Sequence, residues 1–489
     1  MAAPTLSNPW PWPLVTLISA LFILPLLYLF FFRSGRQRAR KRDAPGPPKQ
    51  LPVLGNLLQL GSRPHRYFQA VASKYGPVVQ VQLGRVRMVV VSSPEAAKEV
   101  LRTNDLHCCS RPNSPGARML SYNFLDVAFG PYSDYWREMR KLLVLELLST
   151  RRVQSFAYAR AAEVDRLIDS LSVTPLGTLV DLSEKLYALS DGIIGTVAFG
   201  KIFTFEDFFP SSALAHWADV LTGVARQRRR VFRRIDGFFD AVIDKHLEPE
   251  RLAAGVQEDM VDALVKIWRD DRDAPLALTR ENIKGILMDT FTGGIDTCAV
   301  TTIWIMSELI RNPRVMRKAQ SKVRAAVPSK PRVHEEDVQR LRYLKMILKE
   351  NFRLHPPGTL LIPRETMQSC EIAGYSVPAG TRLHVNVWAM GRDPDIWDRP
   401  QEFYPERFED ADVDFRGFHF ELLPFGSGRR ACPAIAMGVA NVELVLANLL
   451  YCFDWELPKG MKEEDIDMEE TGQLVFRKKV PLSLVPVKH

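Results

Sequence analysis

Cysteine is scarce in this chain, with 6 residues among 489. No two cysteines form a CxxC pair, and their spacing is unlike that of a small secreted domain held together by disulfides. This pattern favours a reducing, cytosolic compartment, in which one cysteine can have a chemical role. The six are Cys108, Cys109, Cys298, Cys370, Cys432 and Cys452.

Charge is lacking at the N-terminus, because no Asp, Glu, Lys or Arg occurs in residues 1–32. The apolar run 12–32 is long enough to cross a bilayer at about 1.5 Å per residue. Basic residues then crowd into 33–50 beside Pro45, Pro47 and Pro48, whereas a nucleic-acid-binding protein spreads its basic charge over a folded surface. We therefore expect a membrane anchor at 1–32, a basic and proline-rich hinge at 33–50 and a globular domain at 51–489, with no nucleic-acid partner. A cleaved secretory signal is the alternative, but a basic n-region and a small-residue cleavage site are missing.

The fold class follows from hydrophobic patterning. Alternating runs at 78–83 and 88–91 flank Gly84 and Arg85, which predicts a β-hairpin. Long helical patterns dominate residues 94–370, short β-like runs return at 374–387, and 436–452 reads as a buried helix. The sequence predicts a mainly α domain with a small β part.

The segment PFGSGRRACP at 424–433 carries the strongest chemical signal. Gly426 and Gly428 let the backbone after Phe425 curl so that N–H groups point at the sulfur of Cys432, and these bonds tune a metal-bound thiolate. Arg430 suits a carboxylate of a cofactor, and the apolar helix that follows directs its positive end at the sulfur. A buried structural cysteine and a dinucleotide turn are the alternatives, but the second lacks a third glycine and an early βαβ position.

A second signal lies in the middle of the helix predicted at 279–311. Gly293 and Gly294 each cost a helix interior about 1 kcal/mol relative to alanine, so the pair calls for a reason. A groove there could admit a flat cofactor and dioxygen, with Thr297 hydrogen-bonding the oxygen and Asp296 linking it to solvent protons. A packing notch for another helix is the alternative.

Further candidates are charged or aromatic. Glu350 and Arg353 share a helix face, and Arg407 could complete a buried network that locks the loop before Cys432. Three more residues could grip the carboxylates of a cofactor: Trp136, Arg140 and Arg364.

Together these residues resemble the cytochrome P-450 superfamily, and the ordered set covers essentially the whole chain. The resemblance implies a cytochrome P-450 fold with an N-terminal transmembrane helix and haem b with Cys432 as axial ligand. It also implies monooxygenase activity on a small lipophilic metabolite. Electrons would come from NADPH through a membrane-bound NADPH-cytochrome P-450 reductase, since the sequence contains no recognisable flavin or nucleotide motif. The single anchor and the PERF segment at 405–408 resemble the microsomal plant A-type group, which places a single-pass protein in the endoplasmic reticulum membrane with its domain in the cytosol.

Other stretches, at 108–116, 191–200, 419–422 and 468–472, resemble grass enzymes that convert 4-hydroxyphenylacetaldehyde oxime to a cyanohydrin in cyanogenic glucoside biosynthesis. Hydroxylation of another specialised metabolite, a haem-thiolate isomerase or dehydratase, and an inactive haem protein remain alternatives. The sequence departs from the family at Ala434, where glycine is usual, and at Cys298, where serine or threonine is usual. The sequence also lacks, near 200–207, the helix that roofs the pocket in the enzymes it resembles, which predicts a shortened variant or an imperfect gene sequence.

Overall fold

The computed structural model describes residues 43–48, 51–190, 224–249, 260–270, 278–472 and 474–489. The expected membrane anchor, most of the basic hinge and the interval that lacks the roof helix lie outside these residues. The helices are α2 (Pro64–Tyr75), α3 (Pro94–Lys98), α4 (Asp105–Cys108), α5 (Pro115–Leu120), α6 (Asp134–Leu142), α7 (Thr150–Ser155), α8 (Ala157–Ser172), α9 (Leu182–Ser190), α12 (Val224–His246), α14 (Met260–Asp270), α15 (Arg280–Arg311), α16 (Pro313–Ala326), α17 (Glu335–Val338), α18 (Arg342–Leu354), α19 (Val387–Met390) and α20 (Ile435–Cys452). The strands are β1 (Val78–Leu83), β2 (Val86–Val91), β3 (Val180–Asp181), β4 (Arg364–Glu365), β5 (Cys370–Ile372), β6 (Tyr375–Val377), β7 (Arg382–Val385), β8 (Phe453–Glu456), β9 (Glu470–Gly472), β10 (Phe476–Lys478) and β11 (Ser483–Lys488).

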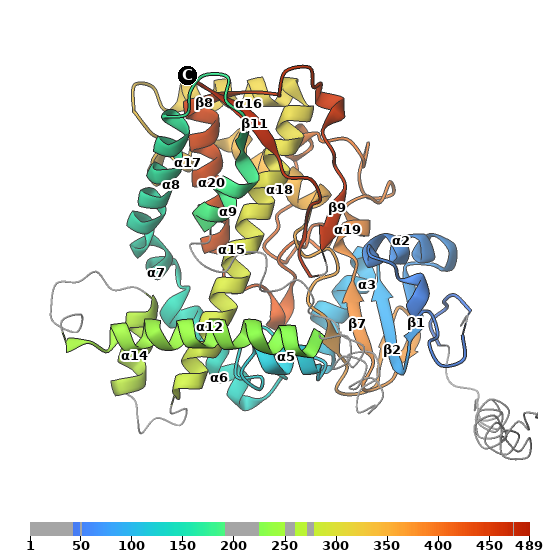
Figure 1. Ribbon diagram of the computed structural model, residues 1–489. Coiled ribbons are helices and arrows are strands. Elements are labelled where there is room, and N and C mark those ends of the chain that lie inside the picture. The colour runs from blue at the N-terminus through green and yellow to red at the C-terminus, as the bar shows by residue number, and fades with distance from the viewer. Residues whose placement is uncertain (1–42, 49–50, 191–223, 250–259, 271–277, 473) are drawn as a thin grey trace, which may run out of the picture.

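The β part is built on the predicted hairpin. Strands β1 and β2 pair antiparallel, from Val78 opposite Val91 to Leu83 opposite Val86, and Gly84 turns the chain with a φ of +59°. Strand β7 adds parallel to β2 and β4 adds antiparallel to β7, so the sheet has the order β1-β2-β7-β4. With α2 and α3, this sheet lies at one side of a larger helical body (Figure 1). The prediction of a mainly α domain with a small β part is confirmed.

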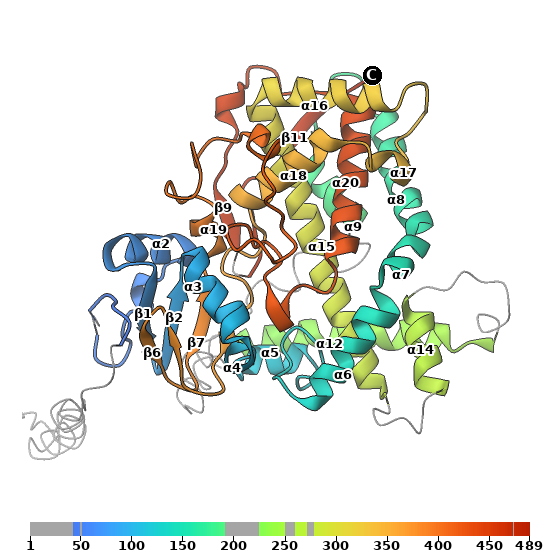
Figure 2. The ribbon, with the colours of Figure 1, turned by 180° about the vertical axis from the view of Figure 1, so that it is seen from behind.

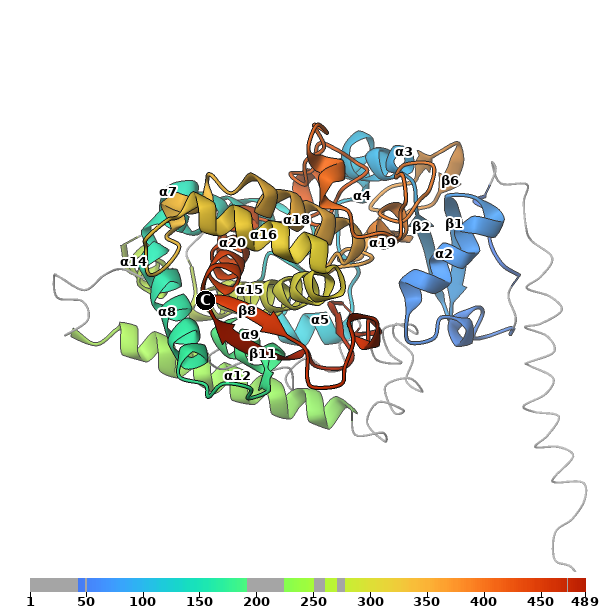
Figure 3. The same ribbon diagram turned by 90° about the horizontal axis from the view of Figure 1, so that it is seen from above.

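The long helix α15 has the boundaries that the sequence predicts. Thr279 is its N-cap and forms a capping box with Asn282, in which each side chain accepts from the backbone N–H of the other residue. The helix ends at Arg311, and Pro313 then starts α16. Seen from above, α15 runs through the helical body with α16 and α18 on one side and α12 on the other (Figure 3).

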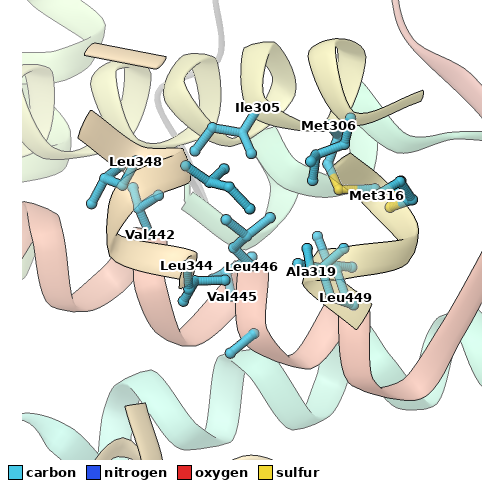
Figure 4. Close-up of a cluster of buried hydrophobic side chains, with 14 of the residues drawn as sticks. Ile305, Met306, Met316, Ala319, Leu344, Leu348, Val442, Val445, Leu446 and Leu449 are labelled. Carbon is cyan, nitrogen blue, oxygen red and sulfur yellow. The ribbon is translucent and has the colours of Figure 1, made fainter. Parts of the chain in front are cut away.

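The largest hydrophobic core lies where α15, α16, α18 and α20 meet. Figure 4 shows side chains of these four helices directed at one another. They include Ile305 and Met306 of α15, Met316 and Ala319 of α16, Leu344 and Leu348 of α18, and Val442, Val445, Leu446 and Leu449 of α20. Helices α7 and α8 follow the outer edge of the body away from the sheet (Figure 2). Because the C-terminal half of α20 is buried, the loop before α20 is held on a rigid base.

Within the described residues, one helix, Ile435–Cys452, has the length and apolar composition of a membrane span. Half of it is buried against other parts of the protein, and it contacts α15, α8 and α16. We therefore assign it to the core, which agrees with the buried helix expected from the sequence.

Candidate functional site

The loop that carries Cys432 is tightly turned. Gly426 and Gly428 have φ values of +68° and +72°, in the left-handed region that favours glycine. A Cβ placed on Gly428 would lie 2.1 Å from the carbonyl oxygen of Leu101, so the backbone there has no room for a side chain. The N–H of Cys432 donates to the carbonyl oxygen of Phe425 at 2.9 Å, which closes the loop.

The surroundings of the Cys432 sulfur favour a bound thiolate over a free one. Burial raises the pKa of the Cys432 thiol, while a hydrogen bond from the backbone N–H of Ala434 and the positive charge of Arg140 act in the opposite direction. Helix α20 begins at Ile435, so its positive end lies close to the sulfur, as the sequence predicts. A metal ion would complete the stabilisation of the thiolate.

A buried carboxylate, Asp105, holds this loop from outside. Asp105 is 3% exposed, and its two oxygens accept from the Arg364 guanidinium at 2.7 Å and from the backbone N–H and guanidinium of Arg429, both at 3.0 Å. A second nitrogen of Arg364 donates to the carbonyl oxygen of Ser427 at 2.8 Å. Sequence reasoning missed Asp105, because it lies more than 300 residues before the loop and belongs to no local motif.

Arginine side chains crowd the same region. Burial lowers the pKa of Arg111, and the positive charges of Arg430 and Arg364 lower it further. Burial likewise lowers the pKa of Arg430 to about 9, and it also lowers that of Arg140. In the part of the chain that the structure describes, no carboxylate lies within ion-pair distance of Arg111, Arg140 or Arg430, whose guanidinium groups donate to backbone carbonyls instead.

Trp136 lies against these arginines. Its ring is 3.9 Å from the guanidinium carbon of Arg430 and 5.6 Å from that of Arg140, which lies one turn later on α6. Its Nε1–H donates to the carbonyl oxygen of Val127 at 2.8 Å, and a nitrogen of Arg430 donates to the same oxygen at 3.1 Å. The structure thus brings together Trp136, Arg140 and Arg430, three of the residues predicted to grip a cofactor's carboxylates.

A second missed residue, Asp289 of α15, fixes the backbone beside Trp136. One of its carboxylate oxygens accepts from the N–H groups of Val127 and Ala128 at 2.7 and 3.1 Å. Burial raises the pKa of Asp289 to about 6, and the hydrogen bonds from Val127 and Ala128 oppose that rise. The segment whose carbonyl oxygen receives Trp136 and Arg430 is therefore fastened to the long helix.

The middle of α15 borders open space. A Cβ placed on Gly293 or Gly294 would meet no atom within 4 Å beyond the adjacent chain. The Thr297 hydroxyl donates to the carbonyl oxygen of Gly293 at 2.5 Å, and Asp296 is partly exposed close to Tyr187 of α9. Apolar side chains at 291, 360–362, 435 and 437 are only partly buried. Open apolar space on α15 and excess positive charge near Cys432 together fit a flat, dianionic group such as haem.

The structure also brings together Glu350, Arg353 and Arg407. Arg353 donates twice to the Glu350 carboxylate at 2.8 Å, and Arg407 Nε lies 3.0 and 3.1 Å from the same two oxygens. The side chains of Glu350 and Arg353 are fully buried, and that of Arg407 is 8% exposed. Arg353 also donates to the carbonyl oxygens of Gly391, Pro400 and Glu402, so the network fastens the segment before the Cys432 loop to α18.

Comparison with known proteins gives one consistent result. The sequence pattern described as Cytochrome P450 matches residues 45–484. A 4-hydroxyphenylacetaldehyde oxime monooxygenase of Sorghum bicolor is 50% identical, with 96% of this chain and 95% of that protein covered. A 2-methylbutanal oxime monooxygenase of Manihot esculenta is 46% identical, with 96% of each chain covered. A zebrafish cytochrome P450 structure with abiraterone has a TM-score of 0.73 at 23% identity and covers 88% of this chain and 100% of that one, which shows a shared fold.

Proposed function

The chain belongs to the cytochrome P450 family, and from this premise we propose that it oxidises plant aldoximes. Family membership makes it a haem monooxygenase that receives electrons from a redox partner. The leading substrate is 4-hydroxyphenylacetaldehyde oxime, and the product is the corresponding cyanohydrin. One observation carries this proposal: two relatives that match almost their full lengths, at 50% and 46% identity, are both named as oxime monooxygenases.

In this proposal the thiolate of Cys432 would hold the haem iron. When bound, the haem would supply oxygen activation, and the Cys432 thiolate would contribute electron density for it. The Ala434 N–H, the start of α20 and the charge of Arg140 stabilise the thiolate. Phe425, Gly426 and Gly428 give the loop its shape.

The cationic cluster would hold the two propionates of the haem. Arg140, Arg364, Arg430 and Trp136 are the predicted donors, and Arg111 joins them from the structure. Arg430 and Trp136 stack at 3.9 Å and share the carbonyl of Val127, so binding of a carboxylate would exchange backbone acceptors for a charged one. Arg364 is already paired with Asp105 and would serve mainly by holding the loop.

Thr297 and Asp296 would deliver protons. Thr297 Oγ1 lies on the helix turn that opens at Gly293 and Gly294, where its hydroxyl proton is held by the Gly293 carbonyl oxygen. A hydroxyl in this place can donate its proton to an oxygen atom beside it. A carboxylate that reaches solvent can then reprotonate the hydroxyl. The partly exposed Asp296, next in the chain, would supply that proton.

The test is turnover in microsomes from cells that co-express this chain with a plant NADPH-cytochrome P-450 reductase. We expect NADPH-dependent formation of cyanohydrin, or of the cyanide that it releases, from 4-hydroxyphenylacetaldehyde oxime, and slower turnover of 2-methylbutanal oxime. The variant Cys432→Ser should lose both activity and the carbon-monoxide spectrum of thiolate-ligated haem. Cys452→Ser, which changes a cysteine at the far end of α20, should keep both. Normal haem spectra without cyanohydrin from either oxime would contradict the substrate class while leaving the haem site intact.

We also propose that residues 1–32 anchor the domain in the endoplasmic reticulum membrane. The uncharged N-terminus supports a membrane anchor, and the basic block after it supports an orientation with the domain on the cytosolic side. After alkaline carbonate extraction of microsomes, the full chain should stay in the pellet, and a chain without residues 1–32 should move toward the supernatant. Full release of the intact chain would contradict the anchor.

A further inference from the structure

Two cysteines outside the haem site face each other. The sulfur of Cys108, on the short helix α4, lies 3.7 Å from the sulfur of Cys370, on strand β5, although 262 positions separate them in the chain. All six cysteines are free thiols in the structure. In the part of the chain that the structure describes, no other two sulfurs lie within hydrogen-bond distance of each other.

The two segments are held in place on both sides of this pair. The Asn104 side chain donates to the carbonyl oxygen of Glu371 at 2.8 Å, and the N–H of Met367 donates to the carbonyl oxygen of His107 at 2.8 Å. The N–H of Ala373 also donates to the Glu99 carboxylate at 2.6 Å. Because these bonds anchor the backbone of both segments, the sulfurs stay opposed at 3.7 Å. They must approach by about 1.7 Å to reach the length of a disulfide, about 2.0 Å.

The two thiols differ as an attacking and a resolving cysteine differ. Cys108 is fully buried, whereas Cys370 is partly exposed to solvent. The hydrogen bond from the Cys108 thiol lowers the pKa of Cys370, and the same contact, together with burial, raises that of Cys108. An accessible thiol of lowered pKa beside a second thiol is the arrangement found in redox-sensitive cysteine pairs.

We propose that Cys108 and Cys370 form a reversible disulfide when the protein meets a small-molecule disulfide such as glutathione disulfide. The Cys370 thiolate attacks one sulfur of glutathione disulfide, which forms a mixed disulfide and releases one glutathione. The Cys108 thiol then attacks the Cys370 sulfur, which closes the intramolecular bond and releases the second glutathione. Two protein thiols are oxidised, one glutathione disulfide is reduced, and the two thiol protons pass to the two glutathione products.

The proposed disulfide would lie close to the residues that hold the Cys432 loop. Cys108 lies on the same short helix as Asp105, whose carboxylate holds Arg364 and Arg429 against that loop. Cysteines that form disulfides in the cytosol are usually catalytic or redox-sensing, and this pair has the accessible thiol that redox sensing requires.

The experiment is a peptide map of the purified, haem-loaded full chain after incubation with glutathione disulfide, with the remaining free thiols blocked by N-ethylmaleimide. Digestion without reduction should give one linked peptide pair, lighter by two hydrogen atoms than the sum of its parts, that contains Cys108 and Cys370. Both cysteines should lose their alkylation together and regain it after dithiothreitol. Cys452, which is also partly exposed but has a guanidinium rather than a thiol beside its sulfur, should stay alkylated.

Two variants separate the steps. Cys108→Ser should stop the reaction at glutathione attached to Cys370, and Cys109→Ser, which changes the neighbouring buried thiol, should form the same linked pair as the unchanged protein. Because the main measurement uses the unchanged protein, it does not depend on how the variants fold. Persistent glutathione on Cys370 without a linked peptide, or a link from Cys108 to any other cysteine, would overturn the proposal.

Discussion

At the scale of single residues, Gly428 shows how a backbone conformation and a close contact combine. The change Gly428→Ala places a methyl group in the left-handed region and against the Leu101 carbonyl oxygen. The matched control is Gly380→Ala, at the same φ of +72° but with no atom within 4 Å of the new methyl group. We expect the control to cost about 1 kcal/mol of unfolding free energy and Gly428→Ala to cost several times more, with loss of bound haem. Urea unfolding and haem content measure both, and equal costs would show that the contact with Leu101 does not matter.

Thr297 is a second residue whose role can be separated from packing. Thr297→Val removes the hydroxyl at nearly constant volume, and we expect product per NADPH consumed to fall about tenfold or more because a positioned proton donor is lost. Thr302→Val is the control, since its hydroxyl also bonds one turn back, to the carbonyl oxygen of Cys298 at 3.0 Å, but is buried. Product yield with a defined amount of NADPH measures both. If the Thr297→Val protein forms as much product per NADPH as the control, Thr297 is not the proton donor.

At the scale of elements, the buried network of Glu350, Arg353 and Arg407 fastens α18 to the segment before the Cys432 loop. Glu350→Ala leaves Arg353 and Arg407 buried without their carboxylate, and we expect it to cost about 3–5 kcal/mol of unfolding free energy. Glu163→Ala breaks an exposed pair with Arg166 at the same i,i+3 spacing and should cost less than about 1 kcal/mol. Chemical denaturation of both variants gives the comparison. Similar losses would mean that the network is no stronger than a surface pair.

At the scale of the whole molecule, Glu406 predicts how stability responds to acid. Burial acts to raise its pKa, but hydrogen bonds from Arg314 at 2.7 Å and Lys318 at 2.8 Å prevail and hold it at about 2. A pKa lowered in the folded state contributes stability that is present above the unfolded pKa and is lost as pH falls through the folded pKa. This contribution should therefore be complete at pH 7 and fade between about pH 4.5 and 2.

The variant Glu406→Gln keeps the shape of the side chain without its charge. Its unfolding midpoint in urea should lie below that of the unchanged protein at pH 7, and the gap should narrow as pH falls below about 4.5. Midpoints measured across this range test the prediction. A constant gap would show that Glu406 contributes through packing or hydrogen bonding alone.

Much of this architecture could be predicted from local sequence patterns. The hairpin at 78–91 follows from alternating β-branched residues around Gly84, and the span of α15 follows from Thr279 and Pro313. The loop at 424–433 was recognisable because the turn glycines, the cysteine and the start of the next helix are adjacent in the chain. The partners of Arg364 and Arg430 were not predictable, because the sequence shows that an arginine is present but not which acceptor the fold brings to it.

The sequence by itself determined the thiol-bearing loop, the mainly α fold and the family, since each depends on residues close together in the chain or on an ordered set of motifs. Only the tertiary structure decided that Asp105 holds that loop, that Asp289 fastens the backbone beside Trp136, and that Cys108 meets Cys370. These contacts join segments that lie far apart in the chain, where the long-range packing of helices and sheet sets the distance between two side chains.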